Sequence, residues 1–255
     1  MSMSSIHLKS RNGGIDIGQN QTVKVNCNIG ANNLNQYKQE IARLNAIKNS
    51  GIMPDSFMDL SLCSFNKPLY RYIDEIFKAS VGVVPAYQLK EYKEVKALDL
   101  LKKYADDGIA FMTLHQVMVE NVGHIDLKKL EAHCSLLKDF NAPIMPLGPI
   151  PTDCAVGMDH IATAIGASFM GYKECAHIIN CITASEHKSS FPSILETIEA
   201  IKVAKLTAHI IDITKGYTKE DEEIYLSRAS ASSCLVSKNK SCNRCDNVCP
   251  LKMKI

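Results

Sequence analysis

Three cysteines near the end of the chain carry the most specific chemistry in the sequence. Cys242, Cys245 and Cys249 have the spacing C-x2-C-x3-C and are followed by Pro250. Three thiolates this close together can each bind one iron of a cubic 4Fe–4S cluster, which leaves the fourth iron without a protein ligand. Such an open iron can chelate S-adenosylmethionine, and electron transfer into the bound sulfonium releases a 5′-deoxyadenosyl radical. The spacing therefore predicts a radical S-adenosylmethionine site.

Two other interpretations of these cysteines remain open. A ferredoxin-type cluster and a zinc site would each require a fourth ligand, and Cys234 is the only nearby candidate upstream. We expect the other cysteines to be small buried side chains rather than disulfides. These scattered cysteines are Cys27, Cys63, Cys134, Cys154, Cys175, Cys181 and Cys234.

Composition limits the classes of function that the chain can have. Its 255 residues carry a net charge of +2, without the clustered basic face of a nucleic-acid-binding protein. Hydrophobic residues make up 46% and charged residues 22%, which is typical of a globular protein. No apolar run approaches the roughly 20 residues of a membrane helix, and the N-terminus has no signal-peptide core. We therefore expect a cytoplasmic protein that binds neither nucleic acid nor membrane.

Short apolar runs alternate with helical patterns as far as residue 190, which is typical of βα units and a parallel sheet. The predicted strands cover 22–29, 57–62, 81–87, 108–115, 142–150 and 175–183. The predicted helices cover 33–49, 69–80, 91–107, 126–140 and 158–171, followed by 193–214 and 219–232.

These elements predict an α/β fold with a (β/α) TIM-like barrel that is reduced to six or seven strands. A C-terminal helical extension and a cluster-bearing tail follow the barrel. The expected domains are an N-terminal extension (1–20), the barrel-like domain (21–190), the helical extension (191–232) and the iron–sulfur tail (233–255).

Several stretches, read in order, resemble the phosphomethylpyrimidine synthase family, whose members carry a C-terminal cluster. The resemblance covers VNCNIG (25–30), FMDLS (57–61), VGVVPAYQ (81–88), DDGIAFMTLH (106–115), LGPIPTDCAVGMDHIATAIGA (147–167), ITASEH (182–187) and the terminal cysteines. The block over 147–187 is the most specific of these stretches.

The resemblance implies a radical carbon–carbon lyase of thiamine biosynthesis. Such an enzyme converts 5-aminoimidazole ribotide to 4-amino-5-hydroxymethyl-2-methylpyrimidine phosphate with a flavodoxin- or ferredoxin-type electron donor. It also implies a homodimer, in which the cluster tail often closes the partner's active site. Two alternatives remain: a paralogue acting on a related substrate, for example to form a hydroxybenzimidazole, and a non-catalytic cluster-binding accessory protein.

The resemblance also implies site residues. Asn28, Met58, Tyr87 and His115 correspond to substrate contacts, and all four lie at carboxyl ends of predicted strands, where barrel enzymes build their sites. His187 corresponds to a ligand of a second metal, zinc or iron. The adjacent Glu186 is either a surface residue or the carboxylate that orients the His187 imidazole.

The chain departs from the family pattern at three places. The family's cluster motif is C-x2-C-x4-C, with one residue more than here. A block that holds the ribotide phosphate is missing after His115, and Met145 replaces a tyrosine. With fewer strands, the barrel either closes at a smaller size or leaves an edge that a partner must cover, which also favours a homodimer.

The segment VENVGHID (119–126) has two interpretations. As the family's metal loop, it would make Glu120 a substrate contact and His124 the second metal ligand beside His187. Alternatively, it is an ordinary loop that leads into the helix over 126–140.

Overall fold

The structure is a computed structural model in which part of the chain can be described. The described residues are 6–10, 13–17, 23–31, 33–59, 80–83, 119–121, 123–137, 144–188, 191–234, 245 and 248–249. The chain divides into two compact units, Met1–Ile211 and Asp212–Ile255. The finer domain boundaries expected at residues 20, 190 and 232 stay predictions.

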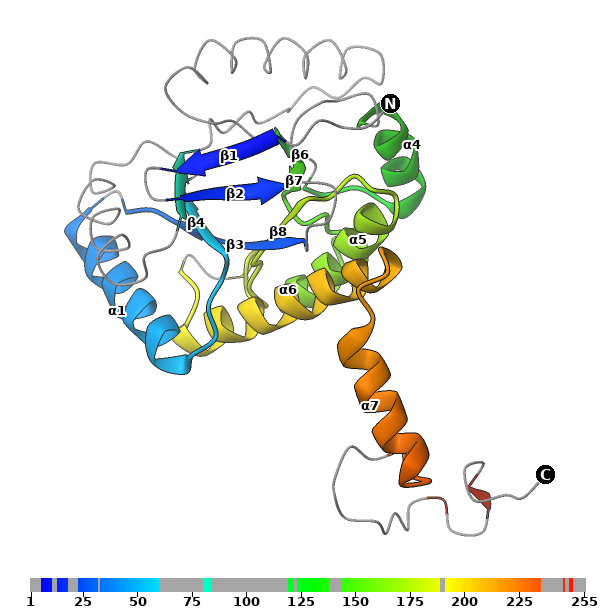
Figure 1. The fold of residues 1–255 in the computed structure, drawn as a ribbon. Coiled ribbons are helices and arrows are strands. Elements are labelled where there is room, and N and C mark those ends of the chain that lie inside the picture. Colours follow the sequence, from blue (N-terminus) through cyan, green and yellow to red (C-terminus); the bar gives the residue numbers. More distant parts are fainter. Residues whose placement is uncertain are drawn as a thin grey trace. The chain divides into compact units, whose positions relative to one another are not determined.

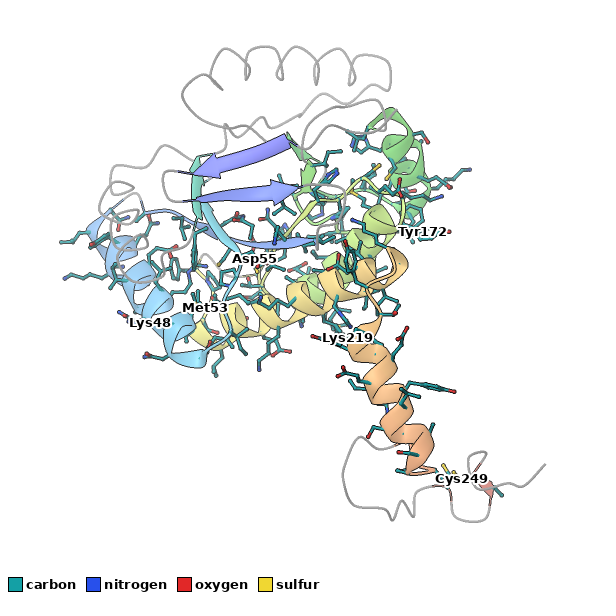
Figure 2. The ribbon with its side chains drawn as sticks, viewed as in Figure 1. Lys48, Met53, Asp55, Tyr172, Lys219 and Cys249 are labelled. Atoms are coloured by element: carbon teal, nitrogen blue, oxygen red, sulfur yellow. The ribbon has the colours of Figure 1, made fainter. Side chains whose placement is uncertain are left out.

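A four-stranded parallel sheet forms the centre of the N-terminal unit (Figure 1). Its order is β5–β4–β3–β8, and the strands are β3 (Lys24–Ile29), β4 (Ser56–Asp59), β5 (Ser80–Val83) and β8 (Ile178–Asn180). The start of β4 is fixed by Asp55, which Figure 2 labels: its carboxylate accepts a hydrogen bond from the backbone N–H of Val25 at 2.8 Å. Because all four strands are parallel, their carboxyl ends lie at one edge of the sheet.

A second parallel pair consists of β6 (Val119–Asn121) and β7 (Ile144–Pro146). The backbone N–H of His177, just before β8, donates to the carbonyl of Ile144 at 2.9 Å, so β7 lies beside β8. Strand β6 forms where the sequence predicted only a loop. Its partner β7 is more than twenty residues away, and a local pattern in the sequence does not show such pairing.

The two faces of β3 differ in chemistry. Val25, Cys27 and Ile29 are buried in hydrophobic clusters that include residues of α1 (Leu34–Ser50) and α6 (Ile194–Thr214). Figure 1 shows both helices running along the same side of β3. Because side chains alternate along a strand, Asn26 and Asn28 lie on the opposite face. The helices thus cover one face and leave the polar residues on the other.

The predicted helices that fall on described residues agree with the structure to within a few residues. Helix α1 begins after Asn33, whose side chain accepts from Gln36 N at 2.9 Å, and it ends at Gly51 with a left-handed φ of 69°. The other helices are α4 (Leu127–Leu137), α5 (Asp159–Tyr172), α6 and, in the C-terminal unit, the fully exposed α7 (Lys219–Ser230).

Some expectations differ from the structure or lie outside it. The N-terminal extension contains an antiparallel hairpin, β1 (Ile6–Ser10) and β2 (Gly13–Ile17), in which Ser10 pairs with Gly13 and which was not predicted. The helices predicted over 69–80 and 91–107 and the strand over 108–115 fall outside the described residues, apart from Ser80, which begins β5.

The described elements establish a mixed α/β fold with parallel strands. They form a four-stranded sheet and two separate two-stranded sheets, so the TIM-like barrel stays a prediction. No helix in this part of the chain is long and apolar enough to cross a membrane.

The scattered cysteines only partly follow the prediction that they are buried. Cys27, Cys134 and Cys175 are buried and Cys181 is half-buried, whereas Cys154 and Cys234 are exposed. Cys154 lies in the loop after Ile150, and Cys234 follows α7, so both lie outside the helices and strands. Cys63 lies outside the described residues.

Helix α5 passes close to the backbone of Pro149. A Cβ at Gly166 would overlap the Pro149 carbonyl oxygen. We therefore expect Gly166→Ala to lower the free energy of unfolding by about 1 to 2 kcal/mol, even though alanine favours a helix by up to about 1 kcal/mol. Gly123→Ala is the matched control, since its added Cβ would lie 3.7 Å from Leu147 O, an ordinary contact. Urea unfolding of both variants checks this, and equal effects would contradict it.

Candidate functional site

Two histidines that are far apart in the sequence meet in the N-terminal unit. The Nε2 atoms of His124 and His187 are 3.0 Å apart, and the ring centroids are separated by 4.5 Å at an interplanar angle of 76°. Both side chains are partly exposed, with 44% and 40% of their surface accessible. The pair is therefore held by protein on one side and open to a ligand on the other.

The backbone around each histidine explains the meeting. His124 follows β6 and forms a parallel bridge with Ile150, supported by the bond from Ile150 N to Gly123 O at 2.8 Å. His187 lies in the turn after β8, closed by the bond from Lys188 N to Ser185 O at 2.9 Å. Both histidines follow the carboxyl end of a strand, and the contact of β7 with β8 brings the two loops together.

Each imidazole also has a carboxylate at its other nitrogen. Asp153 Oδ1 lies 2.6 Å from His124 Nδ1, and Asp159 Oδ1 lies 3.3 Å from His187 Nδ1. A carboxylate accepts a hydrogen bond, so the 2.6 Å contact with Asp153 favours a proton on Nδ1 of His124, and the longer contact with Asp159 would favour the same tautomer of His187. With both protons on Nδ1, the two Nε2 lone pairs would face each other at 3.0 Å and would repel unless a cation lay between them.

The orienting carboxylates were missed in the sequence analysis. Glu186, the residue considered for this role, instead accepts a hydrogen bond from Thr183 Oγ1 at 3.1 Å. Asp159 falls in the helix predicted over 158–171, and neither Asp159 nor Asp153 was singled out. Both aspartates lie in the block over 147–187, the stretch with the most specific resemblance to the family. That position is the signal by which the sequence could have pointed to them.

The chemistry of this donor set fits a transition-metal ion. Imidazole Nε2 suits zinc and iron, and metal-binding histidines commonly donate their other N–H to a carboxylate. Among the described residues, no group of three or more His, Cys, Asp and Glu side chains could hold a metal. Within the described part of the chain, the donors are therefore this pair of imidazoles.

The predicted substrate contacts are placed only in part. Asn28 on β3 and Met58 on β4 are paired in register, so the structure brings these two positions together. Glu120 lies on β6, four residues before His124, where its register partner is Met145. Tyr87 and His115 lie outside the described residues.

The Asn28 side chain is held by a neighbouring amide. Asn26 Nδ2 donates to Asn28 Oδ1 at 2.8 Å and to Asn180 Oδ1 at 2.7 Å. Because Asn26 already engages the amide oxygen of Asn28, that side chain offers its N–H groups to a ligand. Asn26 and Asn180 are buried, so their hydrogen bonds hold the Asn28 side chain in one orientation on the polar face of the sheet.

The backbone of Asn28 depends on a buried ion pair in α1. Arg43 Nη2 donates to the Asn28 carbonyl at 2.6 Å and also contacts Glu40 Oε2 at 2.7 Å. Burial works to lower the Arg43 pKa, but the charges of Cys27 and Glu40 outweigh burial and raise it. Arg43 therefore remains a cation inside the core.

The same guanidinium affects a pair of thiols. The Cys181 thiol donates to Cys27 and so lowers the Cys27 pKa; burial opposes this shift, and the Arg43 charge reinforces it. Arg43 Nη1 lies 3.7 Å from Cys27 Sγ. Burial, followed by the hydrogen bond to Cys27, raises the pKa of Cys181. Of these two thiols, only that of Cys27, the residue before Asn28, has a pKa below its ordinary value.

The cluster cysteines belong to the C-terminal unit. Cys249, labelled in Figure 2, is buried and Cys245 is half-buried. The backbone N–H of Val248 donates to Cys245 O at 3.1 Å, which closes a turn between the two cysteines. Cys242 lies outside the described residues.

Comparison with known proteins gives a family match over most of the chain. The model described as the Radical SAM ThiC family matches residues 3–116 and 116–238. The match is interrupted at residue 116, next to the point where the sequence analysis placed a missing block. It ends before Cys242, so the cluster cysteines lie outside it.

Curated relatives are named phosphomethylpyrimidine synthase. The chain is 29% identical to that of Caldanaerobacter subterraneus subsp. tengcongensis over 229 residues, covering 82% of this chain and 51% of the relative. It is 29% identical to that of Thermoanaerobacter pseudethanolicus, covering 91% and 60%. It is 40% identical to that of Thermotoga neapolitana, covering 60% and 38%. The chain thus spans about half the length of these relatives.

The buried ion pair gives a stability prediction. Glu40→Gln leaves Arg43 buried without its carboxylate, so we expect the free energy of unfolding to fall by about 3 to 5 kcal/mol. The matched control is Glu199→Gln in the exposed pair Lys202–Glu199, which has the same i,i+3 spacing and a distance of 3.7 Å. That variant should lose at most about 1 kcal/mol. Chemical denaturation measures the free energy of unfolding of both variants. Similar losses in the two would refute the conclusion that Glu40 stabilises the buried Arg43.

Proposed function

The chain belongs to the Radical SAM ThiC family, and from this premise we propose that it is a radical S-adenosylmethionine enzyme of the phosphomethylpyrimidine synthase type. The family match over residues 3–116 and 116–238 carries the proposal. The substrate would be 5-aminoimidazole ribotide, and the product 4-amino-5-hydroxymethyl-2-methylpyrimidine phosphate.

Cys242, Cys245 and Cys249 would hold the 4Fe–4S cluster. When bound, the cluster supplies an electron to S-adenosylmethionine at its open iron and so generates a 5′-deoxyadenosyl radical. Burial of Cys249 and partial burial of Cys245 support this role, because a cluster needs shelter from water and oxygen. An electron donor of the flavodoxin or ferredoxin type would reduce it.

The N-terminal unit would bind the substrate. Asn28 would donate its amide N–H groups to an acceptor atom, with Met58, Tyr87, His115 and Glu120 as further contacts. His124 and His187 would hold a zinc or iron ion through Nε2. That ion, when bound, polarises or holds a substrate oxygen or nitrogen as a Lewis acid.

We propose that the strands complete a TIM-like barrel. The parallel order β5–β4–β3–β8 and the parallel pair β6–β7 support this, because β7 also contacts β8. A homodimer would protect an incomplete barrel edge. A reducing cytoplasm would keep the cluster thiols free of disulfides.

A second candidate follows from the length of the chain. The chain spans about half the length of the relatives. Comparison with the family pattern also predicts that the block that holds the ribotide phosphate is missing after His115. A protein without this block would act on a related substrate, such as a precursor of a hydroxybenzimidazole, or would bind the cluster without turnover as an accessory protein.

The first test is cleavage of the cofactor. Anaerobically reconstituted protein with dithionite, S-adenosylmethionine and 5-aminoimidazole ribotide should release 5′-deoxyadenosine, measured by chromatography and mass spectrometry. Cys245→Ser should abolish release, whereas Cys154→Ser, an exposed cysteine outside the tail, should retain it. Cleavage without pyrimidine product favours a related substrate, and a cluster without any cleavage favours the accessory protein.

The second test is metal content. We expect purified protein to bind about one zinc or iron ion per chain in addition to the cluster, and His187→Ala to lose it. His209→Gln on α6 is the control and should retain the metal. Elemental analysis of the Cys245→Ser background separates this ion from cluster iron. Equal metal content in all variants would exclude the His124–His187 site.

A further inference from the structure

We infer that Asp159 is the positioning residue that sets the proton of His187, and that Asp153 serves His124 only as a weak, replaceable partner. This inference rests on the proposed function, in which the two histidines bind a metal ion. It adds two residues of unequal importance to that site.

Asp159 holds His187 at two points. Its Oδ1 lies 3.3 Å from His187 Nδ1, and its Oδ2 accepts from the His187 backbone N–H at 3.3 Å. In return, the Asp159 backbone N–H donates to Ala184 O at 3.4 Å. The turn that carries His187 is therefore fastened to the first residue of α5 by side-chain and backbone bonds.

The two carboxylates differ sharply in burial. The Asp159 side chain is 4% exposed, whereas the Asp153 side chain is 83% exposed. Asp159 therefore cannot turn away without leaving a buried charge unpaired, while Asp153 can exchange His124 for water. A hydrogen bond to an exposed, mobile carboxylate orients an imidazole less firmly.

This arrangement makes an asparagine substitution informative at Asp159. The amide oxygen of Asn would have to accept from the His187 backbone N–H, because that donor has to be satisfied. The amide N–H2 would then face His187 Nδ1 and donate to it. His187 would be forced to carry its proton on Nε2, the atom that must be bare to bind a metal.

The same substitution at Asp153 has no such consequence. The described residues give Asp153 no backbone donor that dictates which amide atom faces His124, so the amide oxygen of Asn can keep accepting from Nδ1–H. Asp153→Asn is thus a matched control with the same chemical change on the other histidine.

The decisive measurement is the Zn²⁺ affinity of the full chain in competition with a chromophoric chelator. Asp159→Asn should weaken Zn²⁺ binding by about 10- to 100-fold, the range typical of such partners. Asp153→Asn should change it by no more than about threefold. Equal losses in both variants, or no loss at Asp159, would overturn the inference. Failure of wild-type protein to bind Zn²⁺ would instead refute the metal site itself.

A spectroscopic readout keeps the test valid if Asp159→Asn folds poorly. Long-range ¹H–¹⁵N spectra of the metal-free wild type, at a pH where imidazoles are neutral, report which ring nitrogen carries the proton. His187 should be the Nδ1–H tautomer in the wild type and the Nε2–H tautomer in folded Asp159→Asn. An Nε2–H tautomer of His187 in the wild type would contradict the inference without any variant.

Discussion

Parallel pairing of the strands is the constraint on which the site depends. A residue at the carboxyl end of one parallel strand shares an edge with those of every neighbouring strand. His124 follows β6, which pairs with β7, and the contact of β7 with β8 brings it to His187, 63 positions later in the sequence. The same pairing sets Asn28 opposite Met58. Because the pairing also buries Asn26 and Asn180, their amides must bond to one another, and this bonding orients Asn28.

The parts of the fold that could be predicted are those with local signals. Asn33 and Gly51 mark the ends of α1 within the sequence itself, because a cap bonds to residues three or four positions away. Strand β6 has only three residues and depends on a distant partner, so no local pattern reveals it. The TIM-like barrel stays a prediction for the same reason: closure depends on pairings between distant segments.

The two histidines of the candidate site could be proposed from the sequence, but the aspartates that contact them could not. His124 and His187 could be proposed from the resemblance to a family. Asp153 and Asp159 bond to residues 29 and 28 positions away, and no spacing rule connects an aspartate to a histidine at that separation. The adjacent Glu186 was considered because it is next in sequence, yet neighbouring residues in a turn point in different directions. Buried Arg43 was missed likewise, since its carbonyl partner is on another element.

The close approach of Gly166 to Pro149 has a consequence for how a metal ion would be received. Pro149 precedes the loop that carries Asp153, and Gly166 belongs to the helix that begins with Asp159. Because no side chain lies between these two segments, they are in direct contact. Under the proposed function, this contact would hold both aspartates in place before an ion arrives, so that little conformational entropy would be lost on capture.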